Sequence, residues 1–207
     1  MSEVVAQPNR TVRFLAAGGI VGPILYTVAW LVLGFLDPSH SHLRDPISNL
    51  SAIGAPYALV MTFIILVFAL LIIAFAYGLH RGLPPGFWAG PAALALAGVG
   101  YVGIALAPLN LASPGEPNVP HTISASVTVF ALMFAPVLMF RRLRRNPRWR
   151  ILGGYSIAAT VLALAFAVMA SLPAFAGLEG LMQRLVTAVL LGWMFVIAIR
   201  LYAQVRP

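Results

Sequence analysis

The sequence predicts an all-α membrane protein, a bundle of six transmembrane helices with both ends of the chain in the cytoplasm. Of its 207 residues, 61% are hydrophobic and only 9% are charged, whereas a soluble domain carries about 25% charged residues. Long apolar stretches follow one another without a hydrophilic block, and each approaches the roughly 20 residues that a helix needs to cross the hydrocarbon. The chain therefore has room for a single transmembrane domain over residues 1–207.

The first two helices follow from apolar stretches bounded by charge, glycine and proline. The first stretch follows a short polar start, is too long for the core of a signal peptide and has no small-residue cleavage site after it. We interpret it as a retained helix over residues 13–36, which ends before Asp37. The second helix, over residues 57–79, contains no charged residue and stops at the tight turn 80–86.

The other four helices are bounded in the same way. The third and fourth are separated by segment 107–120, which holds four prolines, and the fourth and fifth by the arginine-rich segment 141–150. These helices are expected over residues 87–106, 121–140, 151–172 and 180–202.

Small residues on two of these helices predict close packing. Gly18 and Gly22 form a G-x-x-x-G pattern in the first helix, and Ala93 and Ala97 have the same spacing in the third. In lipid, small residues let helix backbones approach each other closely. We therefore expect both helices to pack tightly against neighbours.

The distribution of charge predicts the orientation. With the N-terminus placed inside, 11 of the 13 arginines fall on the cytoplasmic side. Four of the five acids fall outside, namely Asp37, Asp45, Glu116 and Glu179. This agrees with the positive-inside rule, and an odd number of helices would break the partition. The sequence thus predicts a multi-pass protein of the inner (plasma) membrane, N-in and C-in.

Composition also excludes several classes of protein. The chain has no cysteine, which rules out disulfides, thiolate nucleophiles, iron–sulfur clusters and covalently attached haem, and no cofactor is predicted. The net charge of +8 comes from arginines at the ends of apolar segments, so nucleic-acid binding is not expected. Exclusive use of arginine as the basic residue, together with many alanines, glycines and prolines, is typical of a GC-rich bacterial genome.

Polar groups gather at the predicted outer ends of three segments: the first outer loop, the start of the fourth helix and the start of the sixth. No Asp, Glu, Lys, Arg or His lies near the centre of a predicted helix, which argues against a pump, a channel or an ion-coupled transporter. If the bundle brings the three segments together, they form a shallow pocket at the headgroups. The candidate ligand-binding residues are Ser51, Ser124, Gln183 and Arg184.

These polar residues have both a structural and a functional interpretation. Asp45 or Ser48 could cap a short interfacial helix, and His121 could cap the fourth helix or satisfy a loop carbonyl. Arg184 could extend to water or pair with Glu179 or Asp45. Alternatively, the planar fork of Arg184 could bind a phosphate or carboxylate. His121 could then act as a general acid or base, oriented by Asp45 or activating Ser48 as a nucleophile. The candidate catalytic residues are Asp45, Ser48 and His121.

Two function classes stay open, and a third is disfavoured. The prediction is an integral membrane protein with a polar patch at its outer face that binds a lipid or a partner. The alternative is an outer-leaflet lipid hydrolase or transferase, although no nucleophile motif such as G-x-S-x-G is present. A small-molecule transporter is the third class. Whether the chain is an enzyme is left open.

A metal site is a weaker hypothesis. His40 and His42 alternate and could face one way in extended chain, and His121 would complete three histidines, the ligand number of some catalytic zinc sites. An H-x-H pair in an exposed loop is more often solvated, so no metal is predicted.

The expected partners are membrane lipids. Six arginines in the segment 141–150 should attract anionic headgroups, at about 1 kcal/mol per charge near the surface. A membrane-protein partner or a homo-oligomer is also open.

The polar segments resemble a known family. The stretch Asp45–Pro56, His121 with Ser124, and the run Gly180–Arg184 are similar to those of small bacterial and archaeal membrane proteins catalogued as domain of unknown function nine-nine-eight. The resemblance covers nearly the whole chain and implies six membrane helices with no established activity. The family pattern has an acid shortly before the histidine, where this chain has Asn110, which weakens any scheme that needs a carboxylate there.

Overall fold

The computed structural model describes residues 10–83, 85–111 and 118–204, and these form six long helices. All six are long and apolar enough to cross a membrane, which confirms the predicted bundle of six membrane helices. Glu116 and Arg206, two of the residues that predict the orientation, lie outside the described residues. The helices are α1 (Arg10–Leu36), α2 (Ala58–Gly82), α3 (Ala89–Leu106), α4 (Val119–Arg144), α5 (Arg150–Ala170) and α6 (Glu179–Gln204).

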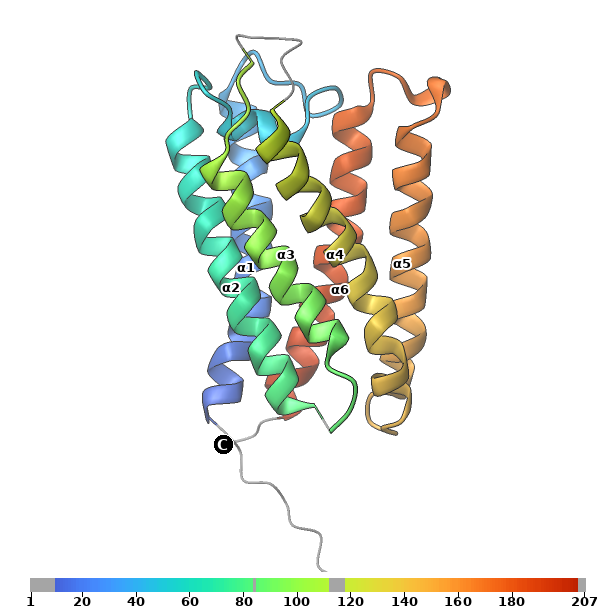
Figure 1. The fold of residues 1–207 in the computed structure, drawn as a ribbon. Helices are drawn as coiled ribbons and strands as arrows, with labels where there is room; N and C mark the ends of the chain where they lie inside the picture. Colours follow the sequence, from blue (N-terminus) through green and yellow to red (C-terminus); the bar gives the residue numbers. More distant parts are fainter. Residues whose placement is uncertain (1–9, 84, 112–117, 205–207) are drawn as a thin grey trace, which may run out of the picture.

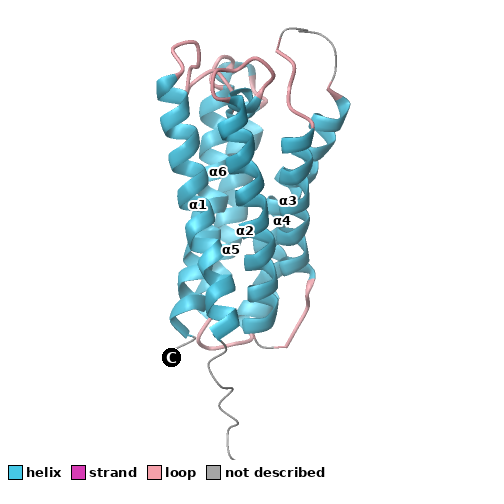
Figure 2. Cartoon of the chain, turned by 90° about the vertical axis from the view of Figure 1, so that its left-hand side faces the viewer, coloured by secondary structure: helices cyan, strands magenta, loops and turns pink. Residues whose placement is uncertain are grey.

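The helices form a closed ring in the order of the sequence. Each helix packs against the one that follows it, and α6 returns to pack against α1 (Figure 1). The described ends Arg10 and Gln204 lie at one end of the bundle, with the α2–α3 and α4–α5 connections; we call this the terminal end (Figures 1 and 2). The opposite, distal end carries the α1–α2, α3–α4 and α5–α6 connections.

Glycines make the predicted close approach between α1 and its neighbour. A Cβ added at Gly18 would lie 2.8 Å from the backbone oxygen of Leu71 in α2, and one at Gly22 would lie 3.2 Å from the Phe68 ring. Without side chains at these positions, the α1 backbone lies directly on α2, as expected for a small-residue interface in lipid. The prediction from the G-x-x-x-G pattern is therefore confirmed for this helix pair.

Four helices extend further than the sequence predicts: α1 at its start, α2 at its end, and α4 and α6 at both ends. α4 begins at Val119 rather than 121, because the Asn118 side chain accepts a hydrogen bond from His121 N (3.1 Å) and caps the helix. It continues to Arg144, so half of the arginine-rich segment is helix rather than loop. Cations in the last turn are favoured by the helix dipole. α2 likewise runs to Gly82, and α5 ends at Ala170.

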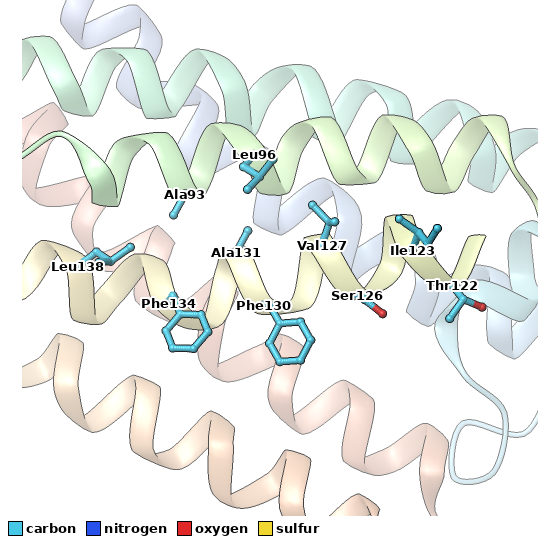
Figure 3. Close-up of a pocket in the computed structure, with 10 residues that line it drawn as sticks. All are labelled: Ala93, Leu96, Thr122, Ile123, Ser126, Val127, Phe130, Ala131, Phe134 and Leu138. Carbon is cyan, nitrogen blue, oxygen red and sulfur yellow. The ribbon is translucent and has the colours of Figure 1, made fainter. Parts of the chain in front are cut away.

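The outer surface of the bundle is apolar, as contact with lipid requires. One groove of about 610 Å³ runs along α4 beside α3. Figure 3 shows Ala93 and Leu96 of α3 facing this groove, while Phe130 and Phe134 project from α4 on the side away from α3. Its lining is nearly all hydrocarbon, so it offers lipid chains a surface but no charged group to select them.

Candidate functional site

The α1–α2 connection, residues 37–57, folds back over the start of α6 at the distal end. We call it the distal loop. Gly180 N donates to Arg44 O (3.1 Å) and Leu181 N to Leu43 O (2.9 Å), so the first amide groups of α6 are satisfied by this loop. Gly180 permits the contact, because a Cβ there would lie 2.5 Å from Asp45 O. The loop is therefore docked on α6 by its backbone.

Arg184 of α6 also binds the distal loop, through its side chain. Its side chain is only 6% exposed, and Nη1 donates to the carbonyl oxygens of His42 (2.8 Å), Asp45 (2.8 Å) and Gly180 (2.9 Å). Its guanidinium carbon lies 5.2 Å from the centre of the Trp30 ring in α1, a distance at which the cation is attracted to the ring face. Arg184 thus joins α6, α1 and the distal loop.

The fourth hydrogen bond of Arg184 determines the protonation state of His40. Nη2 lies 2.8 Å from Nε2 of His40. Since a guanidinium can only donate, Nε2 must accept, and His40 is neutral with its proton on Nδ1. Burial lowers the pKa of His40, and the Arg184 charge lowers it further, more than Asp45 raises it. Burial and Arg184 also lower the pKa of His42, whose two ring nitrogens are buried without a hydrogen-bond partner among the described residues.

We expect the protein to lose stability as the pH falls below about 6.5, the ordinary pKa of histidine. Both pKa values are lowered in the folded chain, so the unfolded chain takes up protons first. The histidine contribution is therefore complete above pH 6.5 and is lost as the pH falls. The check is the unfolding temperature between pH 7.5 and 5 for the wild type, the double variant His40→Gln/His42→Gln and the control His80→Gln.

The double variant should show a flatter pH profile in this range, whereas the control, an exposed histidine at the terminal end, should follow the wild type. Equal slopes for all three would contradict the assignment of His40 as the acceptor.

A polar cavity of about 440 Å³ lies on the outer side of the distal loop. It is lined by the side chains of Asp37, Ser39, His40, Arg44, Asp45 and Asn49, together with residues 53–56 and Leu111. We call it the distal pocket. Its floor is closed by the chain that follows α3, because Ile53 N donates to Leu109 O (2.8 Å).

The two carboxylates of the distal pocket differ in their surroundings. Asp45 accepts from Arg44 Nε (2.8 Å), Arg44 Nη2 (3.0 Å) and Ser41 N (2.7 Å). The hydrogen bond from Arg44 is the main reason that the pKa of Asp45 is lowered. Asp37, 7% exposed, accepts from Ser39 N and Oγ on Oδ1 alone. No described residue donates to its Oδ2, so this carboxylate keeps binding capacity for a ligand.

The structure brings part of the predicted patch together. Gln183 accepts at Oε1 from Ile47 N (2.6 Å), which joins α6 to the distal loop beside the Asp45 carbonyl that Arg184 binds. The short helix expected near Ser48 is present as the 3₁₀ helix η1 (Ile47–Ser51). Its cap position is Pro46, with no side-chain cap, because the Asp45 carboxylate bonds to Ser41 instead. Ser51 Oγ donates to the Ser48 carbonyl (3.0 Å) and is buried.

His121 and Ser124 belong to a different polar group, at the start of α4. The His121 side chain is 5% exposed, and its Nδ1 lies 2.9 Å from the Ala107 carbonyl, so Nδ1 carries the proton. Ser124 packs beside Gly103 of α3. Among the described residues no hydrogen bond joins this group to Asp45, Ser48 or Arg184. The two halves of the predicted catalytic set are thus each engaged locally.

The three-histidine metal hypothesis gains no support. In the described part of the chain, no group of three or more histidines or acids lies close enough together to hold an ion. His40 and His42 are neighbours, with ring centres 5.5 Å apart, but His121 bonds to the α3–α4 connection.

Sequence reasoning did not single out Asp37, Ser39 or Trp30 as site residues. Asp37 directly follows the last residue of a membrane helix. An acid immediately after an apolar segment was the signal that the sequence offered. Trp30 lies inside α1, and an aromatic residue in a membrane helix carries no signal of a cation partner.

Six apolar helices, with polar loops folded over the ends of the ring, define a polytopic α-helical membrane protein. Residues 20–200 match the sequence model of the family described as "Protein of unknown function (DUF998)", and the chain belongs to this family. The match confirms the resemblance predicted from the polar segments. No curated protein and no solved structure matches the chain.

Proposed function

We propose that the protein is a membrane component that binds, in the distal pocket, a lipid headgroup carrying an ammonium group next to a phosphate. The observation that carries this proposal is the gathering of Asp37, Asp45, Arg44 and neutral His40 around one cavity at the end of a membrane bundle. Arg184, which bonds to His40 beside the cavity, balances the two acids together with Arg44. A neutral site that offers both signs of charge suits a ligand that carries both, with its ammonium group near the acids. Arg44 supplies a donor for an adjacent phosphate.

The separate engagement of the candidate catalytic residues supports binding rather than hydrolysis. A general base must reach its nucleophile directly or through one water. The Nδ1–H of His121 is directed to the Ala107 carbonyl rather than to Asp45, and no hydrogen bond among the described residues joins the ring to Ser48. The buried charged residues Asp37, Arg142 and Arg184 lie near the helix ends, which gives a transport path across the membrane no support. With the N-terminus in the cytoplasm, as the arginine distribution predicts, the distal pocket faces outward.

The test is the identity of the lipids that purify with the protein in mild detergent, measured by mass spectrometry. Asp37→Asn keeps the acceptor for Ser39 and removes the charge, so it should reduce a bound ammonium-bearing lipid by about tenfold, the loss of one charge-assisted hydrogen bond. Glu179→Gln, an exposed distal acid outside the pocket, is the matched control and should retain the lipid. The same lipid content in both variants and the wild type would contradict the proposal.

A further inference from the structure

We infer that the terminal end carries a second, independent binding site, in which Arg144 and Arg150 hold the phosphate of an anionic phospholipid. The site lies between the last turn of α4 and the first turn of α5. It goes beyond the distal pocket, since it lies at the other end of the bundle and selects a ligand with a net negative charge. The ligand class is a phosphate ester with acyl chains.

The site is a cavity of about 510 Å³ lined by Arg144, Pro147, Arg150, Ile151 and Gly154. We call it the terminal pocket. The turn between the helices sets the spacing of the backbone at the two arginines, whose side chains are exposed.

The turn is ordered by its own hydrogen bonds. Asn146 N donates to Leu143 O (3.2 Å), Trp149 N to Asn146 O (3.0 Å), and Arg148 N to Asn146 Oδ1 (2.9 Å). Trp149 is almost fully buried and anchors the turn to the core. The terminal pocket is therefore shaped before any ligand arrives.

The charges of the terminal pocket have no carboxylate partner among the described residues. The described acids are Asp37, Asp45 and Glu179, and all three lie at the distal end. The Arg144 guanidinium lies near a ring face, with its carbon 5.4 Å from the centre of Phe140. Arg150 is the first residue of α5, where the positive end of the helix dipole adds to the same field. An anion is thus the group that this pocket lacks.

The other arginines bonded within the bundle provide a contrast. Arg142 donates to the carbonyls of His80 and Leu83, both at 3.1 Å, and Arg184 donates to the distal loop. Arg200 donates to the Arg148 carbonyl (2.9 Å). These three act on the protein's own backbone, whereas the two arginines of the terminal pocket face a cavity.

Gly154 contributes no side chain to the lining of the terminal pocket. A Cβ at Gly154 would meet nothing within 4 Å, and its φ is not positive, so neither packing nor backbone geometry requires glycine. Glycine inside a helix costs about 1 kcal/mol relative to alanine. The adjacent Gly153 differs, since its Cβ would lie 2.6 Å from Arg144 Cγ. A larger side chain in place of Gly154 would therefore occupy space in the terminal pocket without meeting a neighbour at its Cβ.

The apolar part of the lining favours a lipid over a soluble anion. Ile151 is 82% exposed on the outer face of α5, next to the two guanidinium groups. A phosphate held by Arg144 and Arg150 would leave its acyl chains against Ile151 and Gly154, along the lipid-facing side of α5. Basic pockets between membrane helices bind anionic headgroups in this way.

The experiment measures binding of short-chain phosphatidylglycerol to the full-length protein in neutral detergent by native mass spectrometry, with phosphatidylcholine and inorganic phosphate as comparison ligands. Arg150→Gln should weaken phosphatidylglycerol binding by about fivefold, and Gly154→Leu should abolish specific binding by filling the cavity. Arg141→Gln, an exposed arginine of the same helix end outside the pocket, and Gly192→Leu, a helix glycine whose Cβ also meets nothing within 4 Å, are the matched controls.

Unchanged binding in the two controls and an unchanged unfolding temperature in all four variants would support the inference. Equal losses in Arg141→Gln and Arg150→Gln would show general attraction to a basic surface and would overturn it. Full displacement of the lipid by inorganic phosphate, or equal affinity for phosphatidylcholine, would overturn the choice of an anionic lipid. None of these outcomes depends on the distal pocket.

Discussion

Replacing Arg184 with alanine is expected to lower the free energy of unfolding by about 3–5 kcal/mol. The change removes four hydrogen bonds and leaves the partly buried carbonyls of His42 and Asp45 without this donor, beside the space that the side chain occupied. Each buried acceptor left without a donor costs about 1–3 kcal/mol, partly relieved where the loop moves to meet water. The measurement is thermal or denaturant unfolding in mild detergent, followed by tryptophan fluorescence.

Two further variants separate the roles of charge and geometry in this interaction. Arg184→Lys keeps the charge but cannot reach four acceptors with one ammonium group, so it should fall between the wild type and Arg184→Ala. Arg200→Ala removes an exposed arginine with one bond to a backbone carbonyl and should change stability by less than about 1 kcal/mol. A loss of stability in Arg184→Ala no larger than in Arg200→Ala would show that the distal loop is docked without Arg184.

Replacing Gly18 with leucine is expected to disrupt the α1–α2 interface. The free energy of unfolding should fall by about 3 kcal/mol, or the protein should fail to accumulate. A Cβ at this position would lie 2.8 Å from the backbone oxygen of Leu71, and a backbone cannot move aside as a side chain can. Overpacking of this kind commonly costs about 1–3 kcal/mol and more where helices must separate. Expression level and unfolding temperature in detergent are the measurements.

Gly192→Leu is the matched control, because it adds the same side chain to a membrane helix where a Cβ meets nothing within 4 Å. It should fold and unfold like the wild type. Equal stability of the two variants would contradict the prediction that α1 packs closely against α2 at Gly18.

The helices were predictable because their signal is long and repeated, whereas their ends depend on single contacts. Apolar length fixes a membrane span, so six spans could be read without knowing their neighbours. The end of α4 at Arg144 could not, because it rests on Arg142 reaching back to the carbonyls of His80 and Leu83 in another helix. A run of arginines has the same appearance in the sequence whether it is helix or loop.

The gathering of polar residues at one end of the bundle was predicted, but their contacts only in part. Asp45, Gln183 and Arg184 do meet at one end of the bundle, as their shared depth indicated. The sequence could not show that Arg184 bonds to backbone carbonyls, because the path of the distal loop is set by contacts with α6. For the same reason His40, rather than His121, is the histidine beside Arg184.

The closed ring of helices also has a consequence for the order of assembly. Neighbours in the ring are neighbours in the sequence, except at the seam where α6 meets α1. Five of the six helix contacts can therefore form between consecutive segments as each enters the bilayer. The seam requires the first and last helices to meet, at a large loop-closure distance along the chain. The hydrogen bonds from Arg184 to residues 40–45 cross this seam. They can therefore form only once the sixth helix has inserted and the ring of helices has closed.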